Sequence, residues 1–258
     1  MSDALLSGSP FSGENALENA RECGIERFQF TASDGGMLPC CRYVSGTQFH
    51  GKYSLLMFLH GAGSLGNDNL AQVRIPGPPL LRFVQKHQLK TVLLFPQCEK
   101  GFQWVDVPWG DKSHTMPAKP SIFMQRALEL LDEQIAHFQP DPARVYAAGV
   151  SMGGYGAWDL VCRRPHTFAG VLVLCGGADI NQAPKLKQLP AYLMHGDQDP
   201  AVPVTRSRDM VEALRQTGNC QVTYIELPGC AHNVWDPCFA DENALAWLFS
   251  QIKNQSTP

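Results

Sequence analysis

Short apolar runs that alternate with helix-like segments constrain the fold of this chain more than any other feature. Near-continuous apolar strands between helices indicate a parallel sheet that is covered on both faces. Two earlier runs around a Ser-Asp-Gly-Gly turn predict an antiparallel opening hairpin. The apolar runs are 27–31, 41–45, 53–60, 91–96, 144–150, 169–175, 191–195 and 222–227, and the helix-like segments are 121–138, 152–163, 204–216 and 242–253.

The pattern therefore predicts an α/β fold with a mostly parallel, twisted sheet of about eight strands and helices on both faces. The length of 258 residues fits one domain, in which residues 1–25 are an N-terminal extension of the same unit. Only residues 176–189 separate two neighbouring strands late in the chain. That stretch is too short for a large helical cap, so we expect an open site.

Charge and run length exclude two classes of partner. The chain has 21 Lys and Arg against 24 Asp and Glu, a net charge of −3, without a long block of either sign. We therefore expect no nucleic-acid partner. The apolar runs are far shorter than the roughly 20 residues that span a bilayer, so we expect no membrane insertion. The N-terminus lacks the basic and apolar regions of a signal peptide, which predicts a cytoplasmic protein.

The cysteines predict reduced thiols rather than a structural framework. There are nine of them, with no C-x-x-C pair. A zinc site formed by Cys230, His232 and Cys238 is an alternative, but no paired-ligand spacing supports it. We expect neither a metal ion nor a cofactor. The sequence does not decide whether the chain forms a homodimer.

The segment Gly149-Val-Ser151-Met-Gly153 contains the only G-x-S-x-G pattern in the chain. It follows an apolar strand and precedes a helix rich in Gly and Ala. Glycines two positions on either side of a serine allow a strand to turn sharply into a helix, and the serine Oγ is then held exposed. The pattern predicts Ser151 as a nucleophile. The alternative is a serine that only caps the helix.

A serine nucleophile needs a base, and in this arrangement the chain order is serine, acid, histidine. Only His195 and His232 lie well past Ser151, and His195 ends a strand that should supply the acid. His232 is therefore the predicted base. Of the two carboxylates after His195, we favour Asp199 because it lies further into the loop above the sheet. Asp197 is better placed to brace the turn.

Two backbone N–H groups should stabilise the oxyanion. One is that of Met152, directly after the nucleophile. The other should come from the loop after the strand 53–60, which reads His60-Gly-Ala62-Gly63. Ala62 is our choice and Gly63 a close competitor. His60 is interpreted as a structural residue whose ring bonds nearby backbone.

Substrate contacts are expected from two irregular segments that follow predicted strands, 61–79 and 98–120. Trp104 and Trp235 are predicted to lie beside the substrate with Gly63, because an aromatic face packs on acyl or aryl groups. Phe102 and Asp106 could join that wall. The alternative is that the tryptophans are buried anchors.

These segments together resemble the α/β-hydrolase superfamily from about residue 53 to near the C-terminus. The motifs HGAG at His60, GVSMGG at Gly149, HGDQDPAVP at His195 and AHNVWD around His232 occur in the expected order. HGAGSLGNDN and PQCEKGFQW also resemble the esterase branch of polyhydroxybutyrate depolymerases, feruloyl and acetylxylan esterases and predicted peptidases. The resemblance implies a triad of Ser151, Asp199 and His232, with Ala62 and Met152 as oxyanion donors.

The sequence therefore predicts a serine carboxylesterase that acts on small-molecule esters with short aliphatic or aryl groups. A thioesterase or a serine peptidase on the same triad is the alternative among enzymes. From another class, a binding protein without catalytic activity on the same fold is the alternative.

Overall fold

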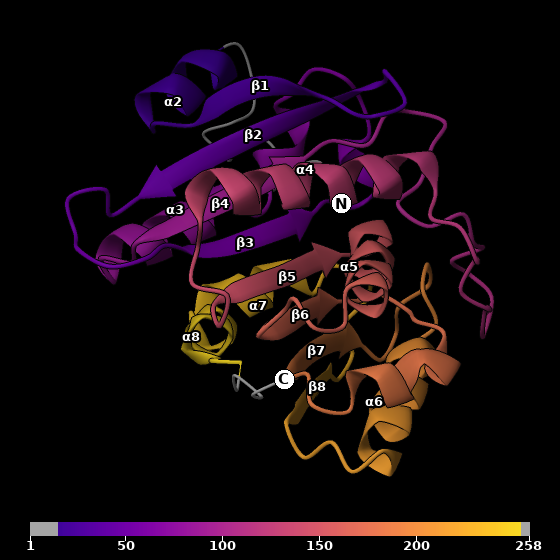
Figure 1. Cartoon of the computed structure of the whole chain (residues 1–258). Coiled ribbons are helices and arrows are strands. Elements are labelled where there is room, and N and C mark those ends of the chain that lie inside the picture. The colour runs from indigo at the N-terminus through magenta and orange to yellow at the C-terminus, as the bar shows by residue number, and fades with distance from the viewer. Residues whose placement is uncertain (1–14, 254–258) are drawn as a thin grey trace.

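The computed structural model describes residues 15–253, and their core is one eight-stranded sheet in the order β1-β2-β4-β3-β5-β6-β7-β8 (Figure 1). Strands β1 and β2 pair antiparallel, β2 pairs antiparallel with β4, and all later pairs are parallel. This confirms the predicted α/β fold. The strands are β1 (Glu26–Thr31), β2 (Met37–Ser45), β3 (Ser54–Leu59), β4 (Thr91–Pro96), β5 (Val145–Val150), β6 (Gly170–Leu174), β7 (Ala191–Gly196) and β8 (Val222–Leu227).

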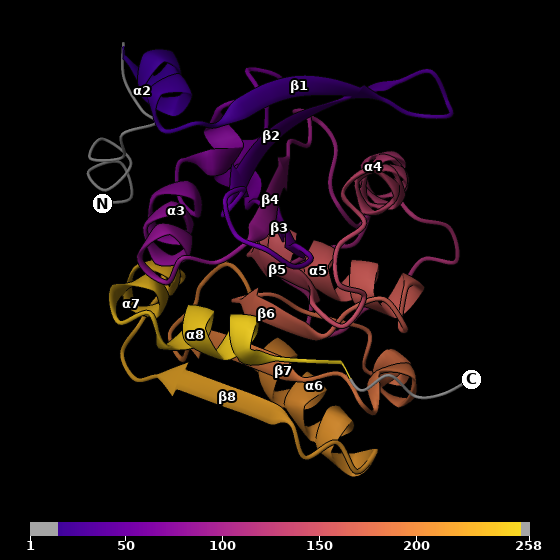
Figure 2. The ribbon, with the colours of Figure 1, turned by 60° about the vertical axis from the view of Figure 1, so that its left-hand side comes forward.

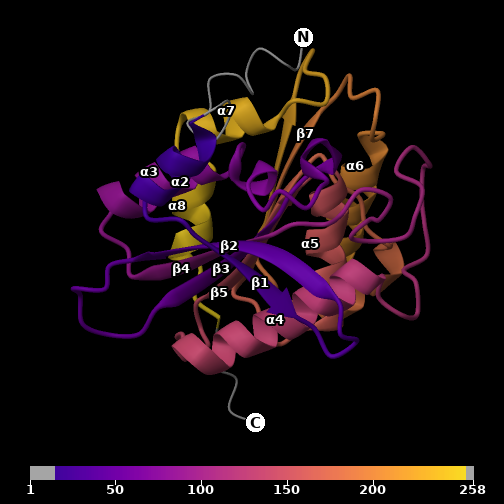
Figure 3. The same cartoon turned by 90° about the horizontal axis from the view of Figure 1, so that it is seen from above.

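Helices cover both faces of the sheet, as Figures 2 and 3 show from two sides. One face carries α4, α5 and α6, and the other carries α2, α3, α7 and α8. The helices are α2 (Ala16–Glu22), α3 (Gly77–Lys86), α4 (Ile122–Phe138), α5 (Met152–Arg163), α6 (Thr205–Gln216), α7 (Trp235–Ala240) and α8 (Asn243–Ser250), with 3-10 turns η1 (Ala62–Ser64), η2 (Ala71–Val73) and η3 (Ile180–Leu186).

The central strands are buried on both faces because each strand feeds two hydrophobic cores. Along β3, Leu55, Met57 and Leu59 belong to the core under α4, α5 and α6. Leu56 and Phe58, which alternate with them, belong to the core under α3 and α8. Side chains in a strand point to opposite faces with a period of two, so a strand covered on both sides is apolar throughout.

Three helices, α2, α3 and α7, were not expected from the sequence. Helix α3 has Pro78 and Pro79 in its first turn, where their missing N–H groups cost no intrahelical bond. The irregular segment expected at 61–79 covers only the first three residues of this helix, and the sequence pattern assigns no structure to residues 80–86. Helix α7 begins at Trp235, which we had placed in a loop. Helix α4 begins where predicted, and the Ser121 side chain accepts a hydrogen bond from the Met124 N–H.

The described part of the N-terminal extension packs on the same body as the rest of the chain. Ala16 and Ala20 of α2 are buried in the core under α3 and α8, together with Ile25. Residues 1–14 of the predicted extension lie outside the described residues. No helix within residues 15–253 is long and apolar enough to cross a bilayer.

Candidate active site

Ser151 stands at the sharp turn between β5 and α5. Its backbone angles are φ 55° and ψ −120°, in a region that residues other than Gly rarely adopt. The two flanking residues must be glycines because neighbouring backbone atoms leave no room for a Cβ. A Cβ on Gly149 would lie 1.9 Å from the Gly153 carbonyl oxygen, and a Cβ on Gly153 would lie 1.9 Å from the Leu59 carbonyl oxygen. The spacing of the motif therefore reflects how closely β5, α5 and β3 approach.

The structure brings Ser151, His232 and Asp199 together in one line of hydrogen bonds. His232 Nδ1 lies 2.6 Å from Asp199 Oδ2, and His232 Nε2 lies 2.8 Å from Ser151 Oγ. A carboxylate only accepts, so we assign the ring proton to Nδ1. Nε2 is then free to accept the proton of the serine hydroxyl. The His232 side chain is partly exposed, and the Asp199 side chain is fully buried.

Asp199 is held as an anion by donors on every side. Ala201 N and Val202 N donate to Oδ1 at 2.8 and 2.9 Å. Burial by itself raises the pKa of Asp199, but the hydrogen bonds from His195, His232 and the Val202 amide outweigh burial and hold the pKa well below its ordinary value. Asp199 is therefore ionised at neutral pH.

Asp197 occupies a different place from Asp199. Its Oδ1 accepts a hydrogen bond from the Gly229 N–H at 2.7 Å, on the loop that carries His232. It thus braces the turn, which is the position that we expected for it. Its geometry offers no contact with the imidazole comparable to that of Asp199.

The predicted oxyanion donors flank Ser151. Met152 is the first residue of α5, so its N–H has no acceptor within the helix. Ala62 begins the η1 turn that follows β3. The intervening Gly61 touches the elbow, because a Cβ on Gly61 would lie 3.4 Å from the Ser151 Cβ. Gly63 is exposed at the tip of the same turn. The approach of this turn to Ser151 is compatible with the predicted oxyanion hole.

His60 fixes the start of this turn through backbone bonds, as predicted. Nδ1 lies 2.7 Å from the Gly61 carbonyl oxygen, and Nε2 accepts from the Cys98 N–H at 2.9 Å. This pair of partners requires the proton on Nδ1 and a neutral ring. Burial lowers the pKa of His60 to about 4.

Trp104 does not lie beside an open site, which corrects our expectation for this residue. Its side chain is fully buried, and its indole Nε1–H donates to the His60 carbonyl oxygen at 3.0 Å. The ring also packs edge-on against the His60 ring, with centroids 5.3 Å apart. Trp104 is therefore a buried anchor for the turn that carries Ala62. A tryptophan with an internal partner for its N–H loses nothing by burial.

The other proposed wall residues are closer to solvent. Trp235 is partly exposed and lies edge-on to the His232 ring, with centroids 5.9 Å apart. Phe102 is 43% exposed, and its ring packs on Phe123 of α4. Asp106 is exposed. Of this group, Trp235 is the residue that the structure places next to the catalytic contacts.

Among the His, Cys, Asp and Glu side chains of residues 15–253, one group of three has ligand atoms within 4.8 Å of one another. It consists of Cys175, Asp199 and His232. This group differs from the zinc alternative, because neither Cys230 nor Cys238 belongs to it. Burial raises the pKa of the Cys175 thiol well above its ordinary value. Both ring nitrogens of His232 already contact Ser151 and Asp199. All nine cysteines are free thiols.

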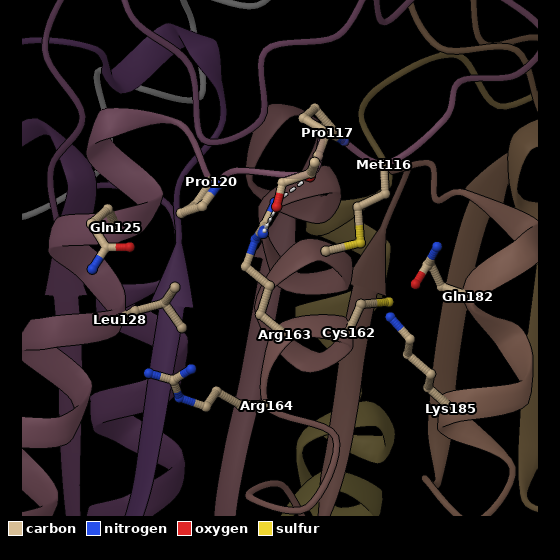
Figure 4. A pocket seen from close by; sticks show the side chains of 11 residues that line it. Met116, Pro117, Pro120, Gln125, Leu128, Cys162, Arg163, Arg164, Gln182 and Lys185 are labelled. Carbon is tan, nitrogen blue, oxygen red and sulfur yellow. Dashed lines mark hydrogen bonds between the residues drawn. The ribbon is translucent and has the colours of Figure 1, made fainter.

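A cavity of about 430 Å³ lies away from Ser151, beside the C-terminal end of α5 (Figure 4). Cys162, one of its lining residues, follows Ser151 by eleven positions. Along a helix this is a rise of roughly 16 Å. At the wall of this cavity, the Arg163 guanidinium donates a hydrogen bond to the Pro117 carbonyl oxygen at 2.9 Å. It also forms an ion pair with Asp159 at 2.6 Å. The cavity therefore has no contact with the candidate catalytic residues.

His195 is the contact that sequence reasoning missed. It lies at the end of the acid-bearing strand β7, as the sequence predicts, but its Nε2 also lies 3.2 Å from Asp199 Oδ2. The two residues are four positions apart around a turn. No helical periodicity links them, so the pattern gave no signal of the contact.

The sequence of this chain is similar to those of known esterases. The model of the phospholipase/carboxylesterase family matches residues 47–243. A probable feruloyl esterase C of Aspergillus niger is 33% identical over 96 residues, which are 37% of this chain and 35% of that protein. The chain thus spans about a third of the length of this curated relative.

Solved structures show the same architecture. A thermostable esterase superposes with a TM-score of 0.78 at 28% identity, covering 89% of this chain and 64% of that chain. An S-formylglutathione hydrolase from Agrobacterium tumefaciens superposes with a TM-score of 0.64 at 16% identity, covering 89% and 96%. The second match shows the fold alone. The family match spans most of the chain and includes all three residues of the Ser151–His232–Asp199 line. This chain belongs to the phospholipase/carboxylesterase family of the α/β-hydrolase fold.

Proposed function

We propose that the protein is a serine carboxylesterase that cleaves small carboxylic esters through an acyl-enzyme. The observation that carries this proposal is the continuous line from Ser151 Oγ to His232 Nε2, at 2.8 Å, and from His232 Nδ1 to Asp199 Oδ2, at 2.6 Å. Acyl transfer needs three groups, and all three are present here. They are a serine on a strained turn, a histidine that can take its proton, and a buried anion that contacts the histidine.

In the first half of the reaction, Ser151 Oγ attacks the ester carbonyl and His232 Nε2 takes the hydroxyl proton. The carbonyl oxygen becomes an oxyanion, for which the Met152 and Ala62 N–H groups are the proposed donors. Collapse of the tetrahedral intermediate breaks the bond to the alkoxy oxygen. The alcohol leaves with the proton from His232, and the acyl group stays on Ser151.

In the second half, His232 takes a proton from water as the water oxygen attacks the acyl carbon. The same donors stabilise the second oxyanion. The bond to Ser151 Oγ then breaks, His232 returns the proton to the serine, and the carboxylic acid departs. Asp199 remains ionised throughout and stabilises the imidazolium.

Short aliphatic or aryl esters are the proposed substrates. Between β6 and β7 the chain forms only the η3 turn, so no helical cap from this segment covers the site. The partly exposed Trp235 beside His232 offers an aromatic face to an acyl or aryl group. A cytoplasmic location is part of the proposal and is supported by the nine free thiols.

The test is hydrolysis of p-nitrophenyl esters from acetyl to long acyl chains, by the wild type and by Ser151→Ala. We expect the highest kcat/KM on short chains and loss of activity in the variant. Thioester and anilide analogues measured in parallel separate a thioesterase or peptidase from an esterase. If wild type and variant hydrolyse none of these compounds and a fluorophosphonate leaves Ser151 unlabelled, the protein is a binding protein and the proposal is wrong.

A further inference from the structure

Two imidazoles, not one, contact the catalytic carboxylate. His195 Nε2 lies 3.2 Å from Asp199 Oδ2, the same oxygen that receives His232 Nδ1 at 2.6 Å. His195 is completely buried at the end of β7. A buried imidazole in contact with a buried carboxylate has a strong electrostatic effect because water does not screen the pair.

The surroundings of His195 determine which nitrogen carries its proton. Nε2 faces two acceptors, the Val202 carbonyl oxygen at 3.0 Å and Asp199 Oδ2. Nδ1 faces the Ser207 hydroxyl at 2.7 Å, and this hydroxyl also lies 3.4 Å from the Gly176 carbonyl oxygen. Because both partners of Nε2 only accept, a neutral ring carries its proton on Nε2 and a lone pair on Nδ1. The acceptors at Nε2 thus select the tautomer that presents an N–H to Asp199, and the Ser207 hydroxyl fits this tautomer by donating to Nδ1.

With this proton all four close contacts of the Asp199 carboxylate are donors. Oδ1 accepts from two backbone N–H groups, and Oδ2 accepts from His232 and faces the His195 N–H, which is shared with the Val202 carbonyl oxygen. The carboxylate cannot rotate without breaking bonds on both oxygens.

From this geometry we infer that His195, oriented by Ser207, is a positioning residue that holds Asp199 Oδ2 toward His232 and takes up part of its negative charge. The inference rests on the proposed function, since it assigns His195 a part in the same reaction. His195 touches no reacting atom, and it acts only through Asp199.

The consequence is a measurable change in how the site responds to pH. Loss of the His195 N–H concentrates more negative charge on Oδ2, which favours the protonated form of His232. The acid limb of the kcat/KM profile then moves to higher pH. We expect roughly half a pH unit, because a neutral donor acts more weakly than the full charge that shifts a carboxyl group by about one to three units.

Other titratable groups face this cluster, and all are retained in the variants below. Burial raises the pKa of Cys175 and Tyr155, and the hydrogen bond from Arg208 lowers that of Glu226, so these three keep one protonation state near neutral pH. The facing groups are Cys175 after β6, Tyr155 on α5, Glu226 on β8, and Cys230 on the loop of His232.

The experiment compares two substitutions that differ in where they place an amide. In His195→Gln the side-chain NH2 reaches the position of Nε2 and keeps a donor for Asp199. In His195→Asn the NH2 reaches only the position of Nδ1, and the donor to Asp199 is lost. Both variants are polar and similar in size, so each controls for the other. Ser207→Ala adds a test of the hydroxyl that contacts Nδ1 and orients the ring.

We expect His195→Asn to lower kcat/KM for p-nitrophenyl acetate by about tenfold, as for a lost hydrogen bond to a charged group. Its acid limb should move upward, while His195→Gln keeps the wild-type limb and most of the activity. Ser207→Ala should fall between the two. Equal activities and equal limbs for the Asn and Gln variants would show that His195 only fills space, and the inference would be wrong.

A second measurement does not depend on ester hydrolysis. The 15N shifts of the His232 ring, followed against pH in a Ser151→Ala background, should show a higher midpoint with His195→Asn than with His195→Gln. If this difference appears while the wild type, with Ser151 intact, hydrolyses no ester, the positioning role stands and the esterase proposal fails. Should His195→Asn not fold, the tautomer of His195 in the wild type decides, because a proton on Nδ1 instead of Nε2 contradicts the inference.

Discussion

Replacement of Asp199 by Asn tests the catalytic line at its most constrained point. All four contacts of this side chain are donors, two backbone N–H groups at Oδ1 and two imidazoles at Oδ2. An amide has one acceptor oxygen and one NH2 group. Whichever way it turns, two of the four donors face another donor.

The two orientations have different costs. If the NH2 points at Ala201 and Val202, two amides lose their acceptor, at about 1–3 kcal/mol each. If it points at His232, the imidazole must place its proton on Nε2 in order to accept at Nδ1. Nε2 then cannot take the proton of Ser151. We expect the second orientation, and a loss of about 10³ to 10⁴ in kcat, as found when a triad histidine is held in the wrong tautomer. That loss corresponds to about 4 to 5.5 kcal/mol in the activation free energy.

The assay is the initial rate of p-nitrophenyl acetate hydrolysis at pH 7.5, with circular dichroism and thermal unfolding to verify the fold. Asp197→Asn is the matched control, since it makes the same change two residues away at a side chain that accepts from the Gly229 N–H. We expect this control to stay within about threefold of the wild type. If Asp199→Asn kept a tenth of the activity, or if Asp197→Asn lost as much, Asp199 would not be the acid of the triad.

Three further predictions concern residues around the site. The pKa of His60 is lowered from 6.5 to about 4 by burial, so below pH 6.5 the unfolded state binds a proton that the folded state does not. Stability should therefore fall between pH 6.5 and 4, by about 3 kcal/mol from this group. Urea unfolding at pH 7 and pH 4.5 measures the fall, and an equal fall in His60→Asn would contradict the assignment. Trp104→Phe removes the indole donor to the His60 carbonyl and should cost about 2–4 kcal/mol of stability without changing acyl-chain preference. An altered acyl-chain preference with an unchanged melting temperature would show that Trp104 contacts the substrate after all. Trp235→Ala should raise KM for aryl esters severalfold more than for acetate, while fluorophosphonate labelling of Ser151 stays intact; equal KM changes for both substrates would remove Trp235 from the binding surface.

The features that the sequence predicted well are those set by close packing around the residues themselves. The spacing of Gly149, Ser151 and Gly153 follows from the close approach of three backbone segments, so the pattern itself carries the geometry. The apolar runs predicted the central strands because a strand covered on both faces has mostly apolar positions. Asp199 followed from its place beyond the strand that ends at His195.

What the sequence did not predict depends on partners far along the chain. Trp104 was expected in a surface loop because of its Gly- and Pro-rich surroundings, but its indole N–H finds an acceptor at His60, 44 residues earlier. Helix α3 was missed because prolines usually interrupt helices, and only their place in the first turn makes them harmless. The contact between His195 and Asp199 spans a turn with no periodic signature.

The most direct test of the esterase proposal is to locate the acyl group on the enzyme. The protein is mixed with p-nitrophenyl acetate, quenched in acid within the first turnover, digested and analysed by mass spectrometry. We predict one acetyl group per chain on Ser151, formed as fast as p-nitrophenol is released and absent in Ser151→Ala. Turnover without an acetyl group on Ser151, or acetylation of another residue at the catalytic rate, would contradict the mechanism proposed for this site.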